Sequence, residues 1–144
     1  MTKHATLALI TAMLLLAAPV APANDGNHLV TVVTSGSSET RAMALILTRQ
    51  HVRSGGTAQV LLCDEGARMA LADADEGPVI EPAGASPSGM LQALTEADVA
   101  VDVCAIFLPN RAETADDLRP GIGVAAPDAI TEAMNRPNAR ILSL

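Results

Sequence analysis

The sequence predicts one α/β domain: a mostly parallel five-stranded sheet with helices on both faces, which makes a three-layer sandwich. Short runs rich in Val, Ile and Leu alternate with segments of helical periodicity, and the links between them are short and rich in Gly or Pro. Such alternation requires right-handed crossovers, which put parallel strands side by side. The 144 residues suffice for one hydrophobic core but not for two.

Residues 1–23 have the pattern of a secretory signal peptide. Lys3 gives a positive start, an apolar run follows over 5–20, and Ala21-Pro22-Ala23 offers a cleavage site. We therefore divide the chain into a signal peptide (1–23) and a mature domain (24–144), and we expect a periplasmic protein without stable membrane insertion after cleavage. An uncleaved anchor is the alternative, although the run is shorter than the roughly 20 residues of a spanning helix.

The charge and the aromatic content restrict the possible partners. The formal net charge is −7 at pH 7, and one of the bases, Lys3, lies in the signal peptide. So acidic a surface disfavours nucleic acid and anionic lipid. The chain has no Trp or Tyr and a single Phe, Phe107, so nothing indicates stacking on bases.

Five strands are predicted at 28–34, 57–63, 99–104, 122–125 and 140–144, and helical segments at 39–53, 64–71, 90–96, 114–118 and 128–135. Ser37 or Ser38 can cap the first helix. Met43, Ile46 and Leu47 of that helix are expected to form its buried face. The acidic segment 73–89 is a long loop, which is either a functional lid or a solvated connector.

The third strand carries the most suggestive residue. Its valines alternate with other side chains, and Cys104 follows at its carboxyl end, just before Pro109-Asn110-Arg111. Open α/β sheets bind ligands at the carboxyl ends of their strands. Cys104 is therefore a candidate reactive thiol, and a small buried core residue is the alternative.

The expected strand order decides whether the two cysteines can meet. The commonest small solution is 2-1-3-4-5, which would separate Cys63 from Cys104 by two strand spacings, roughly 9–10 Å. A disulfide tolerates at most about 7 Å between α-carbons. We therefore expect two free thiols.

Several short motifs together resemble the DsrE/DsrF-like sulfur-relay family. They are Ser35-Gly36, Gly55, Asp64-Glu65-Gly66, Cys104 after Val-Asp-Val, Arg111, Asp116-Asp117-Leu118, Pro120-Gly121 and Ile122-Gly123-Val124. The resemblance implies a flavodoxin-like domain that forms trimers or hexamers. It also implies that Cys104 carries sulfane sulfur as a persulfide and hands it to a partner protein.

The remaining candidate residues have alternatives of their own. Arg111 could steady a thiolate or a persulfide anion, or it could pair with Glu113 or Asp116 at the surface. Cys63 is expected to be structural, because Asp64 and Glu65 disfavour its thiolate.

Neither an anion site nor a metal site is favoured. The run 35–38 could bind an anion at a helix amino end, but it reads more readily as a turn and a cap. His28 and His51 have no partner at metal-ligand spacing, so no metal is expected.

The sequence supports two main functional hypotheses and a weaker third one. The first is a periplasmic sulfur carrier that uses Cys104 and Arg111, needs no cofactor, and works with a sulfur donor or acceptor protein. Whether that relay is a sulfurtransferase-type enzyme stays open. The alternative is a non-catalytic, oligomeric interaction or binding domain with an inert cysteine. A thiol redox protein without a C-x-x-C pair would need a mixed disulfide with a partner.

Overall fold

The computed structural model describes residues 27–144, so the proposed signal peptide lies outside the described residues. The strands are β1 (His28–Val33), β2 (Thr57–Leu62), β3 (Ala100–Val103), β4 (Ile122–Val124) and β5 (Arg140–Ser143). The helices are α1 (Ser38–Arg53), α2 (Pro87–Thr95) and α3 (Pro127–Met134), with short 3-10 helices η1 (Asp64–Ala70), η2 (Leu108–Asn110) and η3 (Ala115–Asp117). Every predicted strand is present.

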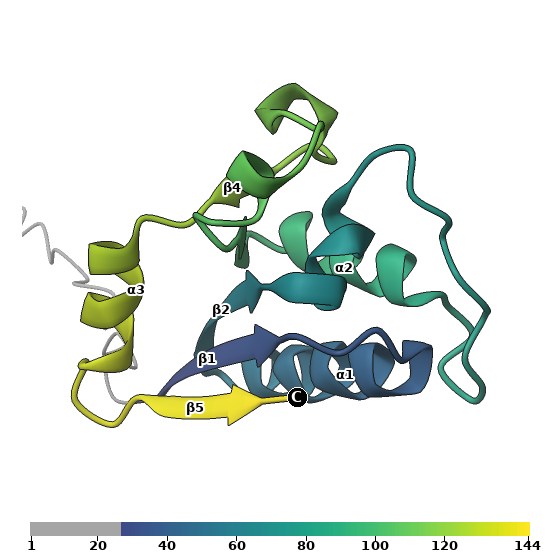
Figure 1. The fold of residues 1–144 in the computed structure, drawn as a ribbon. Helices are drawn as coiled ribbons and strands as arrows, with labels where there is room; N and C mark the ends of the chain where they lie inside the picture. Colours follow the sequence, from purple (N-terminus) through teal and green to yellow (C-terminus); the bar gives the residue numbers. More distant parts are fainter. Residues whose placement is uncertain (1–26) are drawn as a thin grey trace, which may run out of the picture.

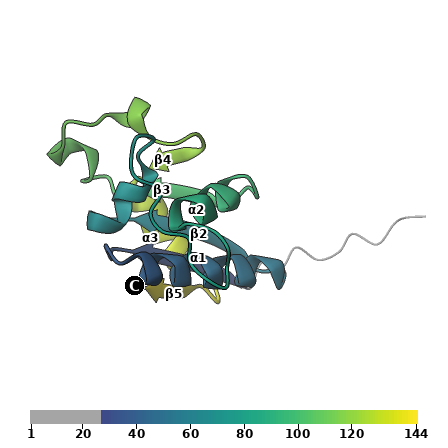
Figure 2. The same ribbon diagram turned by 90° about the vertical axis from the view of Figure 1, so that its right-hand side faces the viewer.

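The five strands form one parallel sheet in the order β4-β3-β2-β1-β5 (Figure 1). The predicted α/β class and the five-stranded sheet are confirmed, but the predicted order 2-1-3-4-5 is wrong. The chain steps in one direction from β1 to β4, and α1 and α2 pack against each other on one face. It then returns through α3, on the opposite face, to β5 at the far edge (Figures 1 and 2).

The face covered by α1 and α2 holds the main core. Val60 and Leu62 of β2 and Val101 and Val103 of β3 are almost completely buried there. On the helix side, Leu45 of α1 and Leu91 and Leu94 of α2 pack in the same core. The alternating valines of β3 thus share this buried face.

Helix α1 turns a different face inward from the one predicted. Its buried residues are Ala42, Ala44, Leu45 and Thr48. Met43 and Leu47 keep 49% and 43% of their surface exposed, and Ile46 is exposed as well. The small alanines let the helix approach the sheet closely, and the Thr48 hydroxyl is paired at 2.7 Å with that of Thr31 on β1. This buried polar pair fixes the rotation of the helix.

The opposite face is covered only in part. Leu61 of β2 packs there with Ala125 and with Ile130 of α3. Val32 and Met134 are half-buried at the margin of this small cluster. One short helix cannot cover five strands, so side chains of β2 and β3 remain accessible on this face.

The acidic segment between η1 and α2 is tied to the rest of the domain. The Arg119 guanidinium makes a 2.7 Å ion pair with Glu76, and its Nε donates to the carbonyl of Met69 at 3.0 Å. An isolated bridge between Leu71 and Leu118 anchors the same region. Within residues 27–144, no helix combines the length and the apolar character that a bilayer crossing requires.

Candidate functional site: a paired cysteine at the carboxyl edge of the sheet

Cys104 lies one residue beyond β3, on the open face of the sheet. Val101 and Val103 point into the α1/α2 core, so Asp102 and Cys104 point to the other side, where both are half-buried. The Cys104 amide continues the sheet by donating to the carbonyl of Leu62 at 2.8 Å. The strand therefore fixes the position of Cys104, which is half-buried at the edge of the sheet.

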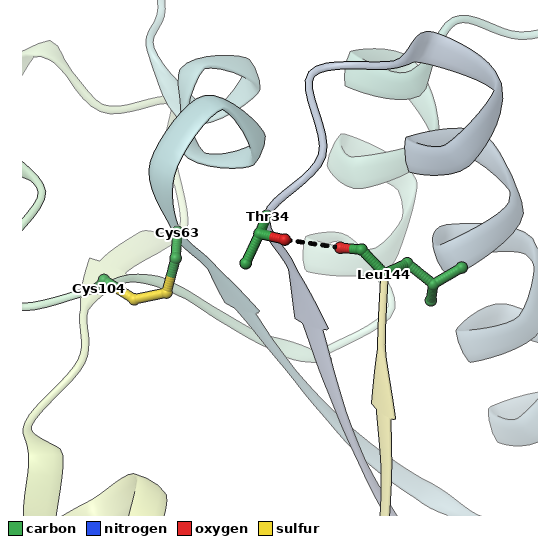
Figure 3. The surroundings of a disulfide bond; sticks show 4 residues. All are labelled: Thr34, Cys63, Cys104 and Leu144. Carbon is green, nitrogen blue, oxygen red and sulfur yellow. Dashed lines mark hydrogen bonds between the residues drawn. A yellow bond between two sulfur atoms is a disulfide. The ribbon is translucent and has the colours of Figure 1, made fainter.

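Cys63 occupies the equivalent place on the neighbouring strand. Its amide donates to the Val33 carbonyl at 2.9 Å. The register pairs Leu62 with Val103, so the next residue of each strand, Cys63 and Cys104, face each other. Their α-carbons are 5.1 Å apart, and the two sulfurs are bonded as a disulfide (Figure 3).

This pairing overturns the expectation of two free thiols. That expectation placed β1 between β2 and β3, whereas β2 and β3 are adjacent. Neighbouring parallel strands lie about 4.8 Å apart, which is within the reach of a disulfide. Cys63 is thus a direct partner of Cys104, a role that the sequence argument did not assign to it.

The chain turns sharply after Cys104. The Phe107 amide donates to the Cys104 carbonyl at 2.8 Å, and Asn110 Nδ2 donates to the Ile106 carbonyl at 2.7 Å. Phe107 is buried beneath this turn, while Ile106 is 75% exposed on its outside. The turn leads directly into η2 and brings Arg111 back toward the cysteines.

Arg111 lies over the ring of Phe107, with Cζ 4.0 Å from the ring centroid. Its Nε is buried and has no hydrogen-bond partner among the described residues. Within the part of the chain that the structure describes, the ion pairs are Arg68–Glu65 and Arg119–Glu76, so the alternative pairing of Arg111 with Glu113 or Asp116 is not seen. The aromatic ring positions this cation, and it retains an unused donor.

Two cavities meet at Cys104. One, of about 320 Å³, is lined by Cys63, Asp64, Cys104, Ile106, Phe107, Asn110 and Arg111. The other, of about 270 Å³, is lined by Leu61, Cys104, Ala105, Ile106, Ala125, Pro127 and Ile130. Cys104 lines both, whereas Cys63 lines only the first. The predicted pair Cys104 and Arg111 is therefore brought together, in the first cavity.

The apolar second cavity was not anticipated from the sequence. Its walls come from β2, from the turn after β3, and from the start of α3, segments far apart in the chain. Only the strand order and the side on which α3 packs could have revealed it. No residue of the acidic segment 73–89 lines either cavity, and the Arg119–Glu76 ion pair holds it as a connector.

The run 35–38 makes local contacts at the start of α1. Ser37 caps α1 by accepting from the Thr40 amide, and Arg41 binds the carbonyls of Ser35 and Glu65, so the run 35–38 serves as a turn and a cap. Among residues 27–144, no group of three or more His, Cys, Asp or Glu side chains could hold a metal ion.

Similarity to known proteins is evident in the fold. No protein family matches the chain by sequence profile, and no curated protein sequence matches it. The structure of the YchN protein from E. coli superposes with a TM-score of 0.63 at 17% identity, covering 83% of this chain and 99% of YchN.

MTH1491 from Methanobacterium thermoautotrophicum, a protein of unknown function, superposes with a TM-score of 0.58 at 16% identity. That match covers 82% of this chain and 99% of MTH1491. Both proteins have the DsrE/DsrF-like fold. The described chain therefore has the DsrE/DsrF-like, flavodoxin-like α/β fold that its motifs predicted.

Proposed function

We propose that the protein carries sulfane sulfur as a persulfide on Cys104 and passes it to a partner protein. The observation that carries this proposal is the position of Cys104 at a strand end, where the residue lines two cavities and shares one of them with Arg111. Accessible cysteines beside a cation are the ones that form reactive thiolates.

The chemistry requires Cys104 in its reduced form. Its thiolate attacks the outer sulfur of a donor persulfide, and the donor leaves as a thiolate. Arg111 faces the resulting persulfide anion and stabilises its charge, while buried Phe107 restricts access of water from below. An acceptor thiolate then removes the outer sulfur, and no metal or organic cofactor takes part. The relay is stoichiometric unless a donor and an acceptor are both present.

The cellular setting is part of the same proposal. Export through residues 1–23 would deliver the domain to the periplasm, an oxidising compartment in which a Cys63–Cys104 disulfide persists. A donor persulfide could therefore load Cys104 only after this disulfide has been reduced. The exposed side chains of Met43, Ile46 and Leu47 on α1 form an apolar surface (the α1 patch) on which copies of the chain would associate as trimers or hexamers.

The test uses the purified protein, reduced and then freed of reductant. A low-molecular-weight persulfide donor should add the mass of one sulfur atom, and dithiothreitol should remove it. Cys104→Ser should abolish the gain, whereas Cys63→Ser should retain it. Arg111→Ala should slow loading, and Arg53→Ala, which removes an exposed arginine from α1, should not. Absence of loading in wild type and Cys63→Ser alike would contradict the proposal.

A second function has its own support. The disulfide occupies Cys104, and the α1 patch exposes the apolar side chains that an assembling domain uses. On this alternative, the protein is an oligomeric interaction or binding domain and the disulfide is a permanent crosslink. Lack of persulfide loading, together with oligomers that survive in Cys63→Ser/Cys104→Ser, would favour it.

A further inference from the structure

We propose that the Cys63–Cys104 disulfide itself is loaded by sulfide, so that the protein converts sulfide into sulfane sulfur without a persulfide donor. The inference rests on the proposed function, because it uses Cys104 as the persulfide site, and it adds the substrate and the oxidant. The oxidant is the disulfide that the structure already contains.

The reaction balances without any other redox partner. A hydrosulfide ion donates its electron pair to Cys104 Sγ and forms a new S–S bond there. The Cys63–Cys104 bond breaks, and its electron pair leaves with Cys63 Sγ, which takes a proton from solvent. The incoming sulfur is oxidised and the Cys63 sulfur is reduced, so one disulfide and one hydrogen sulfide give one Cys104 persulfide and one Cys63 thiol.

The two cavities account for the choice of sulfur. A nucleophile that opens a disulfide attacks one of the two sulfurs, and the other sulfur leaves. The nucleophile must therefore be able to reach the sulfur that it attacks. The cavity bounded by Ala105, Ala125 and Ile130 reaches Cys104 but not Cys63. Its volume of about 270 Å³ admits a small molecule such as hydrogen sulfide. A nucleophile that enters there meets Cys104 first.

The first cavity, of about 320 Å³, accounts for the product. It places Arg111 beside Cys104, and the Nε of that arginine is buried without a partner among the described residues. A guanidinium that lines the same cavity as Cys104 would stabilise the negative charge of a persulfide there. Cys63 lines the same cavity, so the thiolate that leaves can take its proton from solvent there.

The experiment starts from oxidised protein that has no alkylatable thiol. Sodium sulfide is added without oxygen, reductant or persulfide donor, and an alkylating reagent stops the reaction. In a sample taken before the alkylating reagent is added, intact-mass spectrometry should show that the protein has gained the mass of one hydrogen sulfide. Peptide mapping should place an alkylated persulfide on Cys104 and an alkylated thiol on Cys63 in equal amounts. Arg111→Ala should lower the yield or rate by about tenfold, and Arg53→Ala should not.

The controls remove the oxidant in two independent ways. Pre-reduced wild type retains both cysteines and the native sequence, and it should gain no sulfur from sulfide. Cys63→Ser should likewise gain none from sulfide, while it still loads from a persulfide donor if the proposed function holds.

Two outcomes overturn the inference. The first is an oxidised wild type that stays inert to sulfide, and the second is extra sulfur that maps to Cys63. If Cys63→Ser nevertheless loads from a donor, the proposed function stands and only this inference fails. If oxidised wild type accepts sulfide at Cys104 but the reduced protein accepts no sulfur from a donor, the donor-loaded carrier fails and this inference stands.

Discussion

The two faces of the sheet are built in different ways. The face under α1 and α2 is filled by Leu, Val and Ala side chains that are almost completely buried. The face under α3 has a small apolar cluster, two cavities beside Cys104, and a disulfide. The same strands supply both faces, because their side chains alternate. One face therefore supplies most of the stability, and the other can hold reactive groups.

The largest expected effect tests this division within one strand. Leu62→Ala leaves a cavity in the α1/α2 core, where Leu62 is 0% exposed, and should lower the free energy of unfolding by about 3–5 kcal/mol. Leu61→Ala removes the same atoms from the α3 face, beside an existing cavity, and should cost about 2 kcal/mol. Urea unfolding of both variants provides the measurement. Equal losses would show that the two faces contribute alike.

The next effect concerns the disulfide on the open face. It links residues 41 positions apart, and its reduction should lower the free energy of unfolding by about 2–4 kcal/mol, because the unfolded chain gains freedom. Denaturant unfolding with and without reductant measures this difference. Cys63→Ser/Cys104→Ser is the control and should be indifferent to reductant. A wild type equally stable in both conditions would show that the crosslink contributes no stability.

A smaller effect on stability is expected on the outer side of α1. Leu47→Glu changes an exposed residue and should alter the free energy of unfolding by under about 0.5 kcal/mol. If the α1 patch joins copies of the chain, this variant should nevertheless shift the mass seen by light scattering toward the monomer. Arg53→Glu, a charge change on the same helix, should leave that mass unchanged. If the mass of both variants stayed the same as that of the wild type, the α1 patch would not be the surface through which copies associate.

The smallest effect lies at the opposite end of the open face. Burial, and then the positive charge of Arg136, lower the pKa of His28, whose Nδ1 is 2.8 Å from the Thr57 hydroxyl. The folded state therefore binds a proton less readily than the unfolded state, whose His pKa is near 6.5. Stability should fall as the pH drops below about 6.5, and His28→Gln should flatten that dependence. An unchanged slope from pH 7 to 5 would exclude His28 as its cause.

Local patterns predicted much of the fold. The alternation of valines predicted the strand β3, and of the two predicted caps of α1, Ser37 is the one observed. Helix α2 begins earlier than expected, because Ser86 caps it and Pro87 suits the first helical position. These features depend on neighbours in sequence, which is why the sequence reveals them.

Features that depend on distant segments were missed. The buried face of α1 was predicted to consist of Met43, Ile46 and Leu47. That prediction was wrong because nothing in the helix itself shows that Thr48 has a partner on β1. The strand order, and with it the Cys63–Cys104 contact, depends on which edge each crossover selects. Cys104 and Arg111 could be proposed from motif and position, but the apolar cavity beside them could not.

The disulfide can form only when β2 and β3 are paired in the observed register. A slip of one residue in either strand would turn one cysteine to the α1/α2 face and leave the other unpaired. Oxidation therefore crosslinks only those chains in which the two strands are correctly aligned, and it stabilises the native register over the shifted ones.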